Sequence, residues 1–232
     1  MWGRSKGVNS IEGLKMIEER DSRNAGLAGL ASVVLFFIGW FIYGSSPTVA
    51  DEPAAILKFF TESHDQVIWS MFAQGIGALA MIWFMAVLVL VMIDENEAIP
   101  ALIATLSFAI ALTLGSAATI MRSGLAFISV GDISPDTVAV IFYLGSVIDT
   151  CQNIFSAGFF LAVGYSALCS GFLTVMWGWV SILAGLYAIA TTTALDHSGF
   201  WSPHQAGFLN LVFYIIWVGG TSVLLMKRKS TT

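Results

Sequence analysis

The sequence predicts an all-α fold: a polytopic transmembrane helix bundle with six spanning helices and a short surface helix after the first. The 232-residue chain is 57% hydrophobic and has a mean hydropathy of +0.82. Long stretches contain no Asp, Glu, Lys or Arg, and the longest runs for 46 residues, over 150–195. A hydrocarbon core is crossed by about 20 apolar residues at about 1.5 Å rise each. Barrel strands would alternate apolar and polar residues, and these runs do not, so helices are favoured.

The first part of the chain combines a polar segment, one span and a short amphipathic helix. Residues 1–23 form a cytoplasmic segment in which Ile11, Leu14 and Ile17 share one face, which is typical of an amphipathic surface helix. The first span is expected over 24–43. Asp51-Glu52-Pro53 then has the acidic residue and proline of a helix start, so a surface helix is expected over 54–63, too short to cross the bilayer.

The remaining spans are separated by acidic, glycine-containing or proline-containing turns, such as 94–97 and 131–135. The transmembrane domain therefore covers 24–226, and 227–232 form a basic cytoplasmic tail. Small residues four apart, such as Ala25 and Gly29, predict close contacts between helices. The expected later spans are 66–93, 101–122, 136–169, 172–195 and 205–226.

The positions of Lys and Arg predict the orientation of the bundle. Eight of the ten lie at the two ends of the chain, which six spans place on one side of the membrane. Loops rich in Lys and Arg stay in the cytoplasm, so both termini are expected there. The composition gives no basic stripe of the kind that binds nucleic acid. The expected partners are the lipid bilayer and, as a further possibility, another membrane protein or a second copy of this chain.

Two segments carry a family resemblance. They are the surface helix AAILKFF at 54–60 and the segment GWVSILAG at 178–185. With this layout of helices, the chain resembles a widespread bacterial family of six-helix integral membrane proteins of unknown function, common in actinobacteria. It has Thr174-Val175-Met176 where an Arg and a Pro are expected before the Gly-Trp pair. The resemblance implies the helical fold and a bacterial cytoplasmic (inner) membrane location, and it implies no activity.

The fourth expected span contains a polar stripe. Ser146, Asp149, Gln152 or Asn153, and Ser156 recur at spacings of three and four, so they share a helix face. A carboxylate at membrane depth costs about 2.5–3.5 kcal/mol even on insertion scales and usually faces a partner or water. Asp149 is therefore expected to face the bundle interior. A ligand site and a structural hydrogen-bonded Asp are both compatible with this position.

With the expected orientation, polar residues from several spans fall in the outer half of the membrane, above inner halves that are almost wholly apolar. This asymmetry predicts a polar pocket that opens outward. For Arg122 the favoured interpretation is a side chain that extends to the outer interface, and pairing with Asp149, Asp132 or Asp136 is the alternative. The candidate ligand-binding residues are Asp149, Gln152, Asn153, Ser146, Arg122, Asn210 and Tyr214.

No cofactor is expected from the sequence. No histidine lies at the middle of a span, which disfavours a b-type haem, and no lysine lies in a span, which excludes a retinal Schiff base. Imidazoles and carboxylates do gather in the outer loops, where they could bind a divalent metal, but their spacing matches no metal signature. These weaker metal candidates are His64, Asp196, His197 and His204.

Three classes of function remain open at this level. The first, and the favoured one, is a membrane protein without enzymatic activity that binds, or helps to move, a small molecule, ion or lipid headgroup in the outward pocket. The second is an accessory or structural subunit of a larger membrane complex. The third is a membrane enzyme that uses the His and Asp residues of the outer face.

Overall fold

The structure is a computed structural model of the chain and describes residues 19–129, 131, 133–196 and 199–228. This part of the chain is all-helical, without strands. The expected amphipathic helix around Ile11, Leu14 and Ile17 lies outside the described residues. The helices are α1 (Glu19–Tyr43), α2 (Pro53–Glu62), α3 (His64–Asp94), α4 (Ala98–Ile128), α5 (Pro135–Ser170), α6 (Val175–Thr191) and α7 (Pro203–Lys227).

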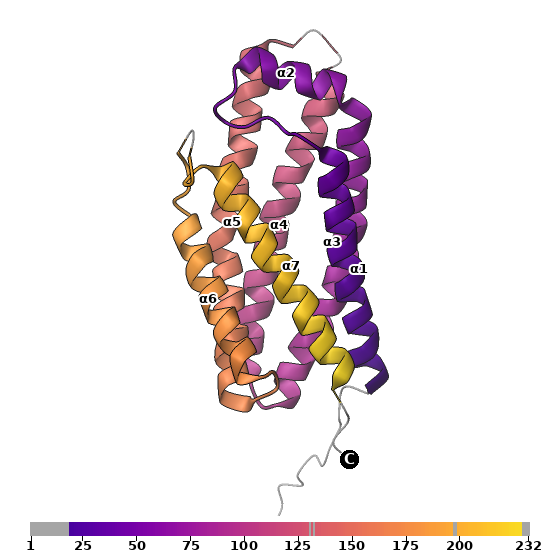
Figure 1. Cartoon of the computed structure of the whole chain (residues 1–232), viewed down its shortest axis with the longest axis vertical. Helices are drawn as coiled ribbons and strands as arrows, with labels where there is room; N and C mark the ends of the chain where they lie inside the picture. Colours follow the sequence, from indigo (N-terminus) through magenta and orange to yellow (C-terminus); the bar gives the residue numbers. More distant parts are fainter. Residues whose placement is uncertain (1–18, 130, 132, 197–198, 229–232) are drawn as a thin grey trace, which may run out of the picture.

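The long helices form one elongated bundle, with α7 crossing it obliquely (Figure 1). α1 begins and α7 ends at the same end of the bundle, and α2 lies across the opposite end. Five of the described helices, α1, α3, α4, α5 and α7, are long and apolar enough to cross a membrane. These helices indicate a multi-pass membrane protein. The remaining expected span, the fifth in chain order, corresponds to α6.

α6 is shorter than the sequence suggests. A span over 172–195 was expected, but the helix has 17 residues, which at about 1.5 Å each reach about 25 Å. It begins late because the Thr174 hydroxyl caps it by accepting a hydrogen bond from the Trp177 amide. It ends at Thr191, where the hydroxyls of Thr192 and Thr193 bond to backbone carbonyls and the chain tightens into turns.

Two other helices extend well beyond their expected bounds. α1 already includes Glu19, five residues before its expected start at residue 24, and α4 continues to Ile128, six residues beyond its expected end at Arg122. An arginine at the edge of an apolar run and the Ser123-Gly124 pair after it suggest a helix end. However, apolar residues resume at Leu125, and both Leu125 and Ala126 are buried against the bundle. The helix therefore continues, and Arg122 lies well inside it.

The short helix after the first span is present as α2. Pro53 occupies its first turn, as the sequence indicated. Ile56 and Phe60 are fully buried, and the Phe60 ring lies 6.1 Å from the ring of Phe142 on α5. α2 therefore packs as a lid on the end of the bundle through one apolar face. Its position at the membrane surface remains a prediction.

The buried apolar residues form two separate clusters. The larger one lies toward the end where α1 begins and includes Phe84, Phe159, Phe160 and Trp217. The smaller one lies under α2 and joins Ile56 and Phe60 to residues of α3, α4 and α5. The region between them holds the polar side chains described below.

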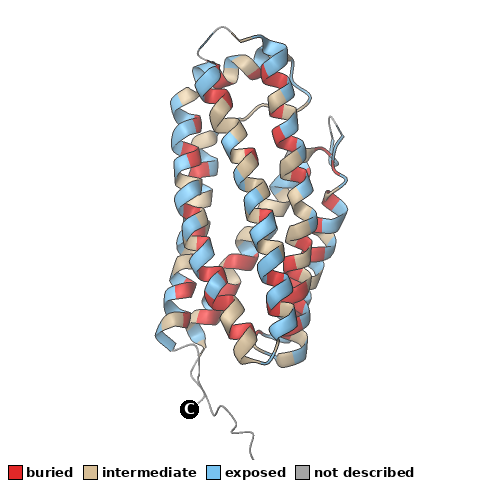
Figure 2. Ribbon diagram, turned by 180° about the vertical axis from the view of Figure 1, so that it is seen from behind, coloured by how far each residue is buried: buried red, intermediate tan, exposed pale blue. Residues whose placement is uncertain are grey.

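Much of the length of the long helices is exposed (Figure 2), and the exposed residues include many large apolar ones. Phe41, Leu79 and Ile120 expose 76%, 69% and 69% of their surface. An apolar exterior of this extent is typical of a surface that lies in lipid rather than in water. Cys151 and Cys169 are free and exposed on α5.

Candidate functional site

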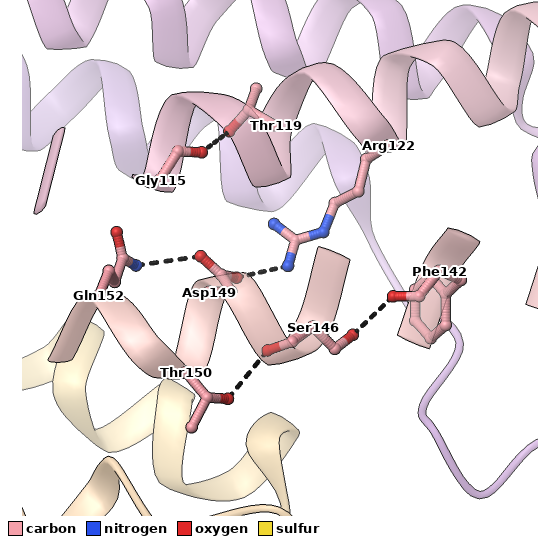
Figure 3. A network of polar contacts seen from close by, with 8 residues as sticks. All are labelled: Gly115, Thr119, Arg122, Phe142, Ser146, Asp149, Thr150 and Gln152. Atoms are coloured by element: carbon pink, nitrogen blue, oxygen red, sulfur yellow. Dashed lines mark hydrogen bonds and ion pairs between the residues drawn. The ribbon is translucent and has the colours of Figure 1, made fainter. Parts of the chain in front are cut away.

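The centre of the site is an ion pair between two long helices. Arg122 of α4 donates a hydrogen bond from Nη2 to Oδ2 of Asp149 on α5 (Figure 3). The other carboxylate oxygen, Oδ1, accepts a hydrogen bond of 3.0 Å from Nε2 of Gln152, one turn further along α5. The carboxyl group therefore faces the bundle interior and meets polar partners, as predicted for Asp149.

The position of Arg122 corrects the interpretation favoured from the sequence. Its side chain does not extend to an interface beyond the helix end, because α4 continues to Ile128 and the guanidinium turns toward α5. The side chains of Arg122 and Asp149 are 23% and 33% exposed. The structure contains the alternative arrangement, in which Arg122 pairs with Asp149.

Gly115 allows Gln152 to reach this position. A Cβ atom added to Gly115 would lie 2.5 Å from the Gln152 Oε1 atom, closer than real Cβ contacts permit. The glycine on α4 therefore leaves room for an amide side chain from α5 at the helix contact. That amide holds the carboxylate from the side opposite to the arginine.

A cavity of about 660 Å³ lies beside this group, bounded by α1, α3, α4, α5, α6 and α7 and by the loop after α1. Pockets for small ligands usually have about 300–1,000 Å³. The seven candidate residues from the sequence all line this cavity, although they come from three helices. They are Arg122, Ser146, Asp149, Gln152, Asn153, Asn210 and Tyr214.

A second polar group lies on the same cavity wall. Nδ2 of Asn210 on α7 donates to the Thr191 hydroxyl at 2.8 Å, and Nδ2 of Asn153 lies 3.5 Å from the Thr191 carbonyl oxygen. The end of α6 thus connects α5 to α7. Thr191 was among the polar outer-half residues of the sequence, but its bridging role could not be predicted, since it depends on where α6 ends.

Several cavity hydroxyls are used within their own helices. Ser146 donates to the Phe142 carbonyl at 3.0 Å, and Thr150 donates to the Ser146 carbonyl at 2.9 Å (Figure 3). Thr119 does the same toward Gly115. Such hydroxyls retain only acceptor lone pairs for a ligand. Ser146 therefore lines the cavity as an acceptor at most.

Tyr43 is a cavity residue that sequence reasoning missed. Its hydroxyl oxygen is buried and has no hydrogen-bond partner among the described residues, although the side chain lines the same cavity as Arg122 and Asp149. Buried hydroxyls are nearly always paired, so a free one at a cavity wall is a place for a ligand or water. Nothing in the sequence indicates this cavity position, because a tyrosine at the end of a span is typical of an interface belt.

The cavity has an apolar end. Met81, Met85, Phe159, Phe160 and Trp217 line it there. The Trp217 ring lies 5.2 Å from the ring of Phe159 and 5.3 Å from that of Phe160, and its indole N–H donates to the Ser181 hydroxyl at 2.7 Å. The larger apolar cluster thus closes the cavity below the polar side chains.

The weaker metal candidates are not brought together in the described part of the chain, where no group of three or more His, Cys, Asp or Glu residues could hold a metal ion. His64 contacts Asp65, with its Nδ1 atom 2.9 Å from the carboxylate. His197 and the side chain of His204 lie outside the described residues, and Asp196 lies in the loop before α7.

Comparison of the chain with protein-family models, with curated proteins and with solved structures gives no match. The chemistry of the site therefore has to be inferred from its own residues. Its lining contains one acidic and one basic side chain, so its ionised groups sum to zero charge, and it offers both hydrogen-bond donors and acceptors.

Proposed function

We propose that this chain is an integral membrane protein that binds, or helps to move, a small molecule, ion or lipid headgroup in the cavity beside Arg122 and Asp149. The proposal includes six spans, with α6 as the fifth, both termini in the cytoplasm and a bacterial cytoplasmic membrane, as the family resemblance suggests. The cavity would then open toward the outer face.

The observation that supports this proposal is the convergence of seven polar side chains from α4, α5 and α7 on one cavity between apolar clusters. A structural ion pair alone needs no such space around it. Water or ligand must solvate the remaining donors and acceptors, because unpaired polar groups at membrane depth are costly.

The accessory-subunit alternative receives less support. Docking to a partner would use helix seams of small residues, but the seams found here serve contacts inside the bundle. A Cβ atom on Gly29 would lie 2.1 Å from the Ser222 hydroxyl, and one on Gly185 would lie 2.8 Å from Leu161. For the enzyme alternative, the described residues add no observation in its favour.

The test compares what copurifies with the full chain in mild detergent, measured by mass spectrometry. The critical variant is Asp149→Asn with Arg122→Gln, which removes both charges and keeps polar side chains of similar size. Thr113→Val is the matched control, since Thr113 is an exposed α4 hydroxyl outside the cavity that bonds to its own helix at 2.8 Å. We expect a bound species with the wild type and the control but not with the double variant. Equal retention by all three proteins would refute the proposed site.

A further inference from the structure

The cavity described above has two chemically different ends. Arg122, Asp149 and Gln152 form a polar end, whereas Met85, Phe160 and Trp217 belong to an apolar end. A purely polar ligand would leave the apolar end facing water. A purely apolar ligand would leave the remaining donors and acceptors of the ion pair, and the Tyr43 hydroxyl, without partners. A ligand that fills both ends is therefore amphipathic.

The cavity also reaches the lipid-facing side of the bundle between α3 and α4. On α3, Phe72 and Leu79 are 59% and 69% exposed, and Gly75 lies between them on the same stripe and lines the cavity. On α4, Ile120 is 69% exposed and also lines the cavity, as does the exposed Ser116. Residues that line the cavity and are also exposed on the outer face of the bundle mark a lateral opening of the cavity.

Gly75 keeps this opening wide. A Cβ atom added there would meet no heavy atom within 4 Å, so the glycine faces open space rather than a packed neighbour. On the other side of the cavity, between α1 and α7, the rings of Trp40 and Phe208 lie 5.8 Å apart and narrow the gap. Gly207 on α7 also lines the cavity and would meet nothing within 4 Å, but among the described residues no such ring pair joins α3 to α4. The α3–α4 side is therefore the less obstructed route for an apolar chain.

The charges of the lining restrict the headgroup. Arg122 and Asp149 already neutralise each other, and the other lining side chains are uncharged at neutral pH. A ligand with a net charge would add an uncompensated charge in a region of low dielectric, which is strongly unfavourable. Hydroxyl, ester, amide or zwitterionic groups can use the donors of Arg122 and Gln152 and the acceptors of Asp149 without that penalty.

We propose that the ligand is a membrane amphiphile without net charge, whose headgroup binds at Arg122, Asp149 and Gln152 and whose acyl chain enters between α3 and α4 past Gly75. The inference rests on the proposed function and specifies its ligand class. The amphiphile moves into the cavity from the bilayer rather than from the aqueous phase.

The test measures binding of defined lipids to the delipidated full chain by native mass spectrometry. The probes are dioleoylglycerol, which is neutral, dioleoylphosphatidylethanolamine, which is zwitterionic, and dioleoylphosphatidylglycerol, which is anionic. Glycerophosphoethanolamine, the zwitterionic headgroup without acyl chains, is the water-soluble probe. We expect the neutral or zwitterionic lipid to bind at least about tenfold more tightly than the anionic lipid and the water-soluble probe.

A pair of glycine variants tests the lateral opening. Gly75→Phe should fold, because its side chain enters open space, and should weaken binding of the preferred lipid by about tenfold or more. Gly124→Phe is the matched control: a Cβ atom there also meets nothing within 4 Å, but Gly124 does not line the cavity. We expect the control to bind like the wild type.

The outcomes separate this inference from the proposed function. Equal binding of the three lipids, no effect of Gly75→Phe, tighter binding of the soluble headgroup, or no lipid binding would each overturn the inference. The proposed site would still stand if the charge-free double variant lost the copurifying species. If lipids bound the wild type and the double variant equally, they would be located on the outer surface, and the inference would also be wrong.

Discussion

Arg122 and Asp149 carry the two opposite charges of a cavity whose other described lining side chains are polar without charge or apolar. Their side chains are 23% and 33% exposed, and this exposure is toward a cavity. Removing the acidic partner and removing the basic partner should therefore have different energetic costs. A lone carboxyl group can be neutralised by taking up a proton, whereas a guanidinium stays charged and keeps needing a partner.

This difference leads to a prediction about stability. Asp149→Asn should lower the free energy of unfolding by about 2 kcal/mol, below the about 3–5 kcal/mol typical of a fully buried broken pair because the site is partly exposed. Arg122→Gln should cost about 1 kcal/mol, and the double variant no more than Asp149→Asn alone. Unfolding of each variant in mixed micelles measures these values. Additive costs in the double variant would show that the two side chains are not coupled.

The polar stripe on α5 could be predicted from the sequence, but the pairing of Asp149 with Arg122 on α4 could not. Ser146, Asp149 and Gln152 are spaced by three residues on one helix, so their common face follows from helix geometry. The contact with Arg122 depends on the register of α4 against α5. A shift of one turn, about 5.4 Å, would place a different residue opposite Asp149, and the sequence contains nothing that fixes this register.

The contact between α6 and α7 shows how small residues position these elements. The Trp177 indole N–H donates to the Thr221 hydroxyl at 2.8 Å, and its ring covers Gly220. A Cβ atom on Gly220 would lie 2.2 Å from the ring, whereas one on the adjacent Gly219 would meet nothing within 4 Å. Two neighbouring glycines therefore have different structural roles.

Alanine substitutions at these glycines should separate the two roles. Gly220→Ala should lower the free energy of unfolding by about 1–3 kcal/mol, because the ring of Trp177 must move. Gly219→Ala should leave the stability unchanged or raise it by up to about 1 kcal/mol through helix propensity. Thermal unfolding of both variants in the same detergent provides the comparison. Equal melting temperatures would indicate that α6 does not pack on Gly220 as described.

Helix boundaries could be predicted where the chain carries strong signals. Pro135 begins α5, one residue before the expected start, and Pro203 begins α7, two residues before the expected start. The hydroxyls of Ser134 and Ser202 cap these helices. The ends of α4 and α6 were missed. α4 continues through Ser123-Gly124 because Leu125 and Ala126 beyond this pair are buried, and burial outweighs the local turn signal. α6 ends where threonine hydroxyls compete for backbone carbonyls, an effect that depends on side-chain rotamers.

The arrangement of the whole molecule bears on the number of times the chain crosses the membrane. α1 begins and α7 ends at the same end of the bundle, as an even number of crossings requires (Figure 1). α6 has 17 residues and is shorter than each of the five long helices. Its length of about 25 Å is less than the roughly 30 Å thickness of an average hydrocarbon core. Local thinning of the bilayer or the turns after Thr191 can cover the difference at modest cost.

Cysteine labelling with an impermeant reagent tests the six-span topology. In a background with Cys151→Ala and Cys169→Ala, one cysteine is placed at Thr61, which is exposed at the end of α2, and another at Ser230, beyond α7. The concentration of Lys and Arg at both ends of the chain predicts labelling of position 61 in intact cells and of position 230 only after lysis. Labelling of both positions in intact cells would mean that α6 does not cross and that there are five spans. Labelling of position 230 alone would mean that the bundle has the opposite orientation.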